Sequence, residues 1–231
     1  MAVQICLCAL AVLSAALFII VRVTKGGALG ILTKTFASFC FLLYGVISLT
    51  QSSFFSSASV FIILGLVCGL IGDIVLDLKY VYKEQNDIYL NGGMLSFSVG
   101  HVFYFVGTII LSQPVVNLLA PILVAAGVSA VMTPATYFIS KKMGLDFGKF
   151  LWQSMGYCFI LNFMTAFTIY LAVLQFEFII LACGMALFLL SDLVLSMQYF
   201  GGKTEDKLLT IVNHGLYYAA QILIATFLFL F

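Results

Sequence analysis

Two aspartates lie inside long apolar segments and share nearly the same neighbours. Asp73 belongs to the stretch Gly-Asp-Ile-Val-Leu at 72–76, and Asp192 belongs to Ser-Asp-Leu-Val-Leu at 191–195. A carboxyl group in hydrocarbon costs a few kcal/mol or more, so such a residue usually faces a protein interior or a water-filled cavity. Because the pattern occurs twice, it predicts a polar site built around both aspartates.

Two histidines, His101 and His214, lie in the apolar segments that follow the two aspartates. Two carboxyl groups that share a water-poor site do not both ionise easily, so one can hold a proton while the other is a carboxylate. That division of roles, with a histidine nearby, is typical of general acid–base catalysis. We therefore expect Asp73 and Asp192 to divide the roles of acid and base, and we expect a functional role for His101, whose helix face also carries Tyr104 and Thr108.

Further polar residues share a predicted helix face with the first aspartate. Gly65, Gly69, Asp73 and Asp77 recur at four-residue intervals, which places them on one side of a helix. The two glycines are typical of a helix-packing seam. Asp77 lies two residues before Lys79, so it is compatible either with the site or with the membrane boundary.

The last apolar segment contains a polar stripe of Tyr217, Tyr218 and Gln221, and Asn213 directly precedes His214. This stripe fits either a substrate pocket or a seam of hydrogen bonds between helices. Aspartate and histidine are also metal ligands, but these spacings are not metal signatures and no cysteine joins them. We expect neither a metal ion nor another cofactor.

The composition indicates an integral membrane protein. The 231-residue chain is 64% hydrophobic and only 8% charged, whereas about a quarter of the residues in an average soluble protein are charged. No charged stretch is long enough to bury a core of its own, so we expect one transmembrane domain over 1–231, with the lipid bilayer as a partner. The net charge of +1 provides no basic face for nucleic acid.

Charged stretches and Ser/Gly/Pro breaks divide the chain into eight apolar segments, which predict an all-α polytopic membrane protein with eight transmembrane helices. The segments cover 2–23, 30–49, 59–78, 89–111, 115–139, 150–174, 178–200 and 207–231. Lys and Arg flank the first, third, fifth and seventh connections and are absent from the second, fourth and sixth. The positive-inside rule then predicts cytoplasmic odd connections and both termini outside.

Helix geometry places the two aspartates and the two histidines roughly 9 to 16 Å inside the cytoplasmic boundary, at about 1.5 Å per residue. Because they share one layer, we expect the site to lie in the cytoplasmic half of a bacterial inner membrane or an endoplasmic reticulum membrane. Tyr80 and Tyr199 lie at the same boundary and are typical of interfacial anchors.

The third and fourth segments resemble the seventh and eighth. The two aspartate stretches align without a gap, and His101-x-x-Tyr104 matches His214-x-x-Tyr217. Four segments separate the copies, so both copies cross the membrane in the same direction. The sequence therefore predicts a parallel 4+4 pseudo-repeat, with halves of about 1–112 and 113–231 and the aspartates facing each other across its axis.

In their order and spacing, these motifs resemble the YhhN-like lysoplasmalogenase family. The stretch 72–76, followed by Gly-His-Val-Phe-Tyr at 100–104, is similar to one family signature, and the stretches 187–195 and 217–221 are similar to a second. Lys34 also matches, although Thr35 stands where the family often has proline. The resemblance covers nearly the whole chain, including the number of spans.

Members of that family hydrolyse the vinyl ether bond of lysoplasmalogens to a fatty aldehyde and a glycerophospho-ethanolamine or -choline. The resemblance implies a lysophospholipid substrate, catalysis by Asp73, Asp192 and His101, and supporting roles for further residues. The supporting residues are Lys34, Tyr104, Ser191, Tyr218 and Gln221. Lys34 is expected either to hold the lipid phosphate or to be an ordinary lysine at the membrane boundary. Asp77 and His214 depart from the family pattern, and a catalytic Asp77–His214 pair is the alternative assignment.

Three other functions fit parts of the pattern. Buried acids and a same-direction repeat also occur in proton-coupled transporters. A non-catalytic lipid-binding protein would bind a lysolipid and release it intact. A metal-dependent membrane hydrolase would require more histidines than the 2 in this chain. The sequence contains no signal for an oligomeric state.

Overall fold

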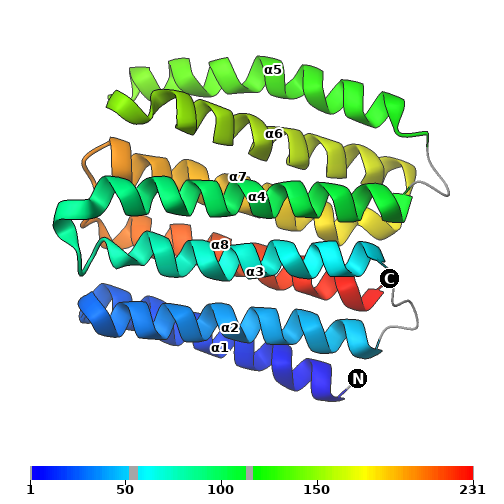
Figure 1. Cartoon of the computed structure of the whole chain (residues 1–231), viewed down its shortest axis with the longest axis horizontal. Helices are drawn as coiled ribbons and strands as arrows, with labels where there is room; N and C mark the ends of the chain where they lie inside the picture. Colours follow the sequence, from blue (N-terminus) through cyan, green and yellow to red (C-terminus); the bar gives the residue numbers. More distant parts are fainter. Residues whose placement is uncertain (1, 52–56, 113–116, 231) are drawn as a thin grey trace.

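The computed structural model describes residues 2–51, 57–112 and 117–230. Within these ranges the chain forms eight long helices (Figure 1). They are α1 (Ala2–Thr24), α2 (Gly27–Gln51), α3 (Ser57–Leu78), α4 (Asn86–Ser112), α5 (Leu119–Lys142), α6 (Leu151–Leu174), α7 (Ile179–Phe200) and α8 (Lys207–Leu230). Short 3-10 turns precede three of them, namely η1 (Lys83–Gln85), η2 (Gly148–Phe150) and η3 (Phe176–Phe178).

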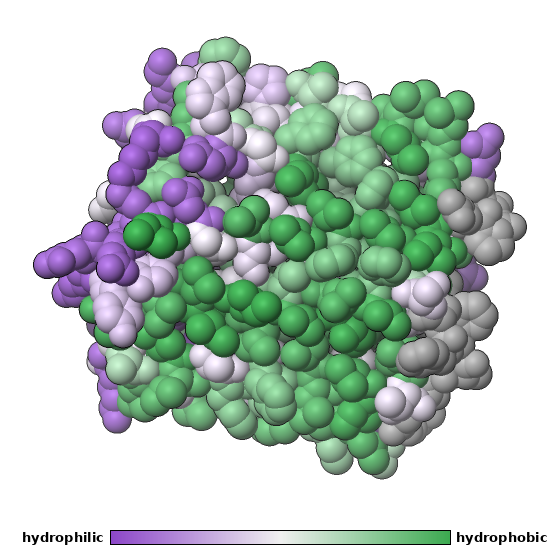
Figure 2. Space-filling model, viewed as in Figure 1, coloured by the Kyte–Doolittle hydropathy of each residue, from purple (hydrophilic) through white to green (hydrophobic). Residues whose placement is uncertain are grey.

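The outer surface of the bundle has the character of a lipid-facing surface. All eight helices are long and apolar enough to cross a membrane. Large hydrophobic side chains such as Leu13, Leu95 and Trp152 are exposed, and apolar residues dominate the visible face in Figure 2. Exposed apolar surface of this extent marks contact with a membrane. The predicted all-α, multi-pass membrane fold is therefore confirmed.

Predicted and observed helix boundaries differ most at α5, which was expected at 115–139 and is observed at Leu119–Lys142. Residues 113–116 lie outside the described part of the chain. The helix continues beyond its last apolar residue because the Met143 amide still bonds to the Ile139 carbonyl. Gly144 then ends the turn with a φ of +81°, in the left-handed region that glycine adopts without strain.

Most helices pack against their neighbours in the chain, and α8 also packs against α1 and α2. α1 packs on α2, α3 on α4, α5 on α6, and α7 on α8. The contact between α2 and α3 has a counterpart between α6 and α7. The predicted pseudo-repeat requires this order, but the repeat itself remains a prediction. The start of α1 and the end of α8 lie at one end of the bundle, and polar side chains gather at the opposite end (Figures 1 and 2).

Glycines on α3 let two other helices approach closely. A Cβ atom at Gly65 would lie 2.2 Å from the Tyr104 ring of α4. A Cβ atom at Gly69 would lie 2.6 Å from the Gln221 amide of α8. The predicted small-residue seam is therefore present. It places Tyr104 and Gln221 directly against α3, next to the acidic end of the same helix face.

Candidate active site

A cavity of about 260 Å³ lies at the polar end of the bundle, and both Asp73 and Asp192 line it. Its wall comes from α2, α3, α4, α7 and α8, and the residues that follow α3 and α7 form its mouth. Other predicted site residues in this wall are Lys34, Asp77, Ser191, Asn213, His214 and Tyr217. The fold thus brings most of the predicted site residues to one space.

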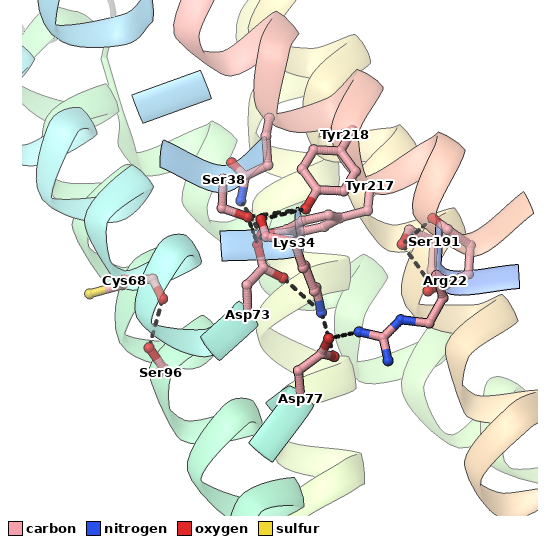
Figure 3. A network of polar contacts seen from close by, with 12 residues as sticks. Arg22, Lys34, Ser38, Cys68, Asp73, Asp77, Ser96, Ser191, Tyr217 and Tyr218 are labelled. Carbon is pink, nitrogen blue, oxygen red and sulfur yellow. Dashed lines mark hydrogen bonds and ion pairs between the residues drawn. The ribbon is translucent and has the colours of Figure 1, made fainter. Parts of the chain in front are cut away.

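A chain of alternating charges, which we call the charge ladder, runs along one side of the cavity (Figure 3). Lys34 Nζ lies 3.1 Å from Asp73 Oδ1 and 3.1 Å from Asp77 Oδ1. The Arg22 guanidinium pairs with the other oxygen of Asp77. Two cations and two carboxylates on α1, α2 and α3 therefore neutralise one another. Pairing of this kind offsets the cost of burying each charge.

Asp73 is also held by neutral donors. Ser38 Oγ donates a hydrogen bond of 2.5 Å to Asp73 Oδ2, and Tyr217 Oη donates one of 2.7 Å to the same oxygen. Tyr218 Oη lies 3.1 Å from Ser38 Oγ and donates to the Lys34 carbonyl over 3.2 Å. The Asp73 carboxylate is therefore fixed by side chains from both α2 and α8.

Tyr104 and Gln221 reach this carboxylate only indirectly. Tyr104 Oη donates to Gln221 Oε1 over 3.1 Å, and Gln221 Nε2 donates to Tyr217 Oη over 3.0 Å. Tyr217 then donates to Asp73. Because neither Tyr104 nor Gln221 lines the cavity, both support the orientation of Tyr217 instead of facing the open space.

Asp192 has different surroundings. Tyr157 Oη, from α6, donates a hydrogen bond to Asp192 Oδ2. No lysine or arginine in the described part of the chain forms an ion pair with it. Asp192 is half-buried, and it also lines an apolar pocket of about 80 Å³ between α4, α5, α6 and α7. It therefore lies where the polar cavity meets an apolar one.

Ser191 and Asn213 join α7 to α8 beside Asp192. Asn213 Nδ2 donates to the Ser191 carbonyl over 2.8 Å and to Ser191 Oγ over 3.0 Å. Ser191 Oγ lies 3.1 Å from the Asn213 carbonyl and donates to it. This reciprocal pair fixes the backbone directly before Asp192, so its polar atoms are used within the protein.

The two histidines lie in different places. His101 is buried outside the cavity wall, its Nδ1 lies 2.9 Å from the Phe97 carbonyl of the same helix, and its ring packs edge-on against Phe188. His101 thus does not line the cavity, but its ring also lies edge-on to that of Tyr157, with 6.3 Å between the ring centres, and Tyr157 is the phenol that donates to Asp192. His214 does line the cavity and packs edge-on against Phe18.

The cavity offers two carboxyl groups with unlike environments. Asp73 is held as a hydrogen-bond acceptor by a cation and two hydroxyl groups, whereas Asp192 has one phenol donor. Among the residues that the structure describes, no three His, Cys, Asp or Glu side chains converge to form a metal-binding group. The arrangement suits the transfer of protons between two acids.

The sequence model of the YhhN family matches residues 29–228. The chain belongs to the YhhN family. This family contains lysoplasmalogenases. The match covers every residue that lines the cavity, whereas Arg22, which pairs with Asp77 from α1, precedes it. No curated protein and no solved structure is matched by the chain.

Three residues of this candidate site, Arg22, Ser38 and Tyr157, were not predicted from the sequence. Ser38 follows Lys34 by four residues on α2, and that spacing was a usable signal for a shared face. Arg22 at the end of α1 has the pattern of a boundary residue. Tyr157 is a polar group in an apolar helix, and nothing nearby in the sequence indicates which helix it contacts.

Proposed function

We propose that this protein hydrolyses the vinyl ether bond of lysoplasmalogens within the membrane. The observation that carries the proposal is one cavity lined by two carboxyl groups in unlike surroundings, with Asp192 at its border with an apolar pocket. A lysoplasmalogen has a matching division, because its vinyl ether joins a polar glycerophospho group to an apolar chain. Membership of a family that contains lysoplasmalogenases supports the same substrate.

Asp192 is the proton donor in this mechanism. No described cation pairs with it, and Tyr157 leaves one of its oxygens available to the cavity. Its proton moves to the vinyl carbon that is farther from the ether oxygen, and the electron pair of the double bond forms the new C–H bond. An oxocarbenium ion remains at the carbon next to the ether oxygen.

Asp73 stabilises this cation and accepts a proton from water. A fixed carboxylate beside a developing positive charge lowers the barrier without having to reorient. Water adds to the oxocarbenium carbon and gives one proton to Asp73, which leaves a hemiacetal. The hemiacetal hydroxyl returns a proton to Asp192, the C–O bond to glycerol breaks, and Asp73 protonates the leaving oxygen. An aldehyde and an alcohol form, and both aspartates regain their starting states.

The test is aldehyde release by purified protein in detergent micelles, with a 1-alkenyl lysolipid and a 1-alkyl lysolipid of the same head group as parallel substrates. We expect aldehyde from the alkenyl lipid alone. General acid–base catalysis contributes about 100- to 10,000-fold, so Asp73→Asn and Asp192→Asn should each lower the rate by at least about 100-fold. Micelles hold no gradient, so turnover there also distinguishes an enzyme from a transporter.

Asp87→Asn is the matched control, because Asp87 is a surface acid paired with Lys149 and lies outside the cavity wall.

His101→Gln tests whether His101 belongs to the catalytic group, as the family resemblance implies, or whether the two aspartates act without it. A loss as large as that of Asp192→Asn would return His101 to the catalytic group. Full aldehyde release by both aspartate variants would contradict the mechanism.

A further inference from the structure

Lys79 directly follows α3 in the cavity mouth, and only 7% of its surface is exposed. Its Nζ lies 3.4 Å from the centre of the Tyr199 ring and 5.0 Å from that of Tyr80. No carboxylate in the described part of the chain pairs with it. Burial, and then the charges of Lys34 and Arg22, lower the pKa of Lys79. Burying an ammonium group without an anion is costly, so this position is suited to bind one.

The cation expected to bind phosphate, Lys34, is already engaged. Figure 3 shows its ammonium group directed to both Asp73 and Asp77. An anion would have to displace one of these carboxylates to reach it. Lys79 has no such competitor, and Lys83, which begins η1, is a second and more exposed cation in the same cavity wall.

The distance between the mouth and the aspartates fits one lipid head group. Lys79 follows Asp73 by six residues, which corresponds to roughly 9 Å along a helix axis. An extended glycerol with its bridging oxygens and phosphate has a similar length. A phosphate at Lys79 would therefore leave the vinyl ether beside Asp73 and Asp192. The hydrocarbon chain would then reach the apolar pocket that Asp192 also lines.

We propose that Lys79, with Lys83 beside it, binds the phosphate of a lysophospholipid head group. The ammonium on the Tyr199 ring provides the main contact, and the more exposed Lys83 adds a second charge. The inference rests on the proposed function for the identity of the lipid, and it assigns the phosphate to a residue other than Lys34. It predicts that the protein distinguishes lipids by the presence of phosphate.

The test uses the full chain in non-ionic micelles and two ligands that contain no vinyl ether. One is 1-alkyl-glycerophosphoethanolamine, and the other is 1-alkylglycerol of the same chain length. Affinity is taken from the rise in Tm with ligand concentration. We expect the phospholipid to bind about 10- to 100-fold more tightly, as for a hydrogen bond to a charged group. Equal binding of both lipids by the wild type overturns the proposal without any variant.

Lys79→Gln should lose most of the preference for the phospholipid, and Lys79→Arg should retain it because the positive charge remains. Lys142→Gln is the matched control, since Lys142 is an exposed lysine outside the cavity wall. Lys79→Gln leaves no carboxylate unpaired, so we expect it to fold, and its Tm without ligand checks this. An undiminished preference in folded Lys79→Gln contradicts the role of Lys79.

Inorganic phosphate and glycerophosphoethanolamine distinguish a lipid head group from free phosphate. We expect both to bind more weakly than the lysolipid, because they lack the chain. If inorganic phosphate binds as tightly as the lysolipid, the site takes free phosphate. If glycerophosphoethanolamine does, the site takes a soluble phosphodiester, and either result makes the lipid assignment wrong. Neither alkyl lipid can release an aldehyde by the proposed reaction. The binding result therefore stands or fails independently of the hydrolysis assay.

Discussion

Asp73 and Asp192 show how one residue type obtains two chemical characters from its neighbours. Lys34, Ser38 and Tyr217 all direct donors at Asp73, which fixes its orientation. Asp192 receives one phenol hydrogen bond and faces two cavities. A rigid acceptor and a less constrained acid are the two groups that a proton relay requires.

Tyr157→Phe tests whether the phenol positions the proton donor. The variant removes the Tyr157 hydrogen bond to Asp192 and keeps the ring. We expect the rate of aldehyde release to fall by about 10- to 100-fold, since hydrogen bonds to charged groups contribute about 1.5–3 kcal/mol. The measurement is kcat with the alkenyl lysolipid. Tyr170→Phe on the same helix is the control, and an equal effect of both variants would rule out a specific role for Tyr157.

The sequence predicts individual site residues well where the signal lies within one helix. Asp73 and Asp77 share a face by their spacing, and that face is buried. Partners from other helices have no such signal. Tyr80 and Tyr199 were expected to be interfacial anchors, which stays a prediction, and the sequence did not indicate that Tyr80 stacks on Arg22 at 4.3 Å or that Tyr199 contacts the Lys79 ammonium. Helical periodicity defines a face without identifying what that face meets.

At the scale of helices, the charge ladder ties α1, α2 and α3 together, and its balance can be tested. Lys34→Met leaves Asp73 without a cation, whereas Asp77 keeps Arg22. We expect the free energy of unfolding to fall by about 3–5 kcal/mol, as for other buried pairs that lose one partner. Denaturation in mixed micelles measures this change.

The double variant Lys34→Met with Asp73→Asn is the matched comparison for that prediction. It removes one positive and one negative charge together, so the ladder is neutral again. We expect it to recover much of the stability lost by Lys34→Met alone, while aldehyde release stays low. If the double variant loses as much stability as Lys34→Met and Asp73→Asn together, the two charges are not coupled.

Close approach of α3 to its neighbours is a second property of the helices. In Gly65→Ala the new methyl group would overlap the Tyr104 ring, which lies 2.2 Å from the Cβ position. Overpacking of this kind costs about 1–3 kcal/mol. Gly127→Ala on α5 is the control, because nothing lies within 4 Å of its Cβ position. We expect a lower Tm for the first and an unchanged or higher Tm for the second.

The helices themselves could be predicted because hydrophobic length is a strong signal in membrane proteins. α6 and α7 each begin within one residue of the predicted segments, at Leu151 and Ile179. α5 was less well predicted, because its polar end at Lys141 and Lys142 continues the helical hydrogen bonding beyond the apolar stretch. Backbone geometry, which hydropathy does not measure, determines such ends.

At the scale of the whole molecule, the polar end of the bundle holds the cavity mouth, and its orientation in the membrane is a prediction. Asn117 lies two residues before α5, and Lys142 is the last residue of that helix. In a chain whose six cysteines are replaced by alanine, Asn117→Cys should react with an impermeant maleimide added outside intact cells. Lys142→Cys should react only after permeabilisation, because the positive-inside rule places it in the cytoplasm.

Each of these two positions is the control for the other, since one lies just before α5 and the other is its last residue. The reverse labelling pattern would place the cavity mouth outside the cell and would contradict the inner-leaflet site. That result would not decide the proposed chemistry, which the aldehyde assay tests. Orientation and reaction are thus tested separately.

Arg22, Lys34 and Lys79 belong to the positive residues that indicate how the chain threads through the bilayer, yet all three side chains are withdrawn into the folded bundle. If the predicted orientation is correct, the same ammonium and guanidinium groups act first during insertion and later within the folded bundle. A substitution at any of them changes the signal read by the insertion machinery as well as the finished site. Loss of function at these positions therefore has to be compared with the amount of correctly inserted protein.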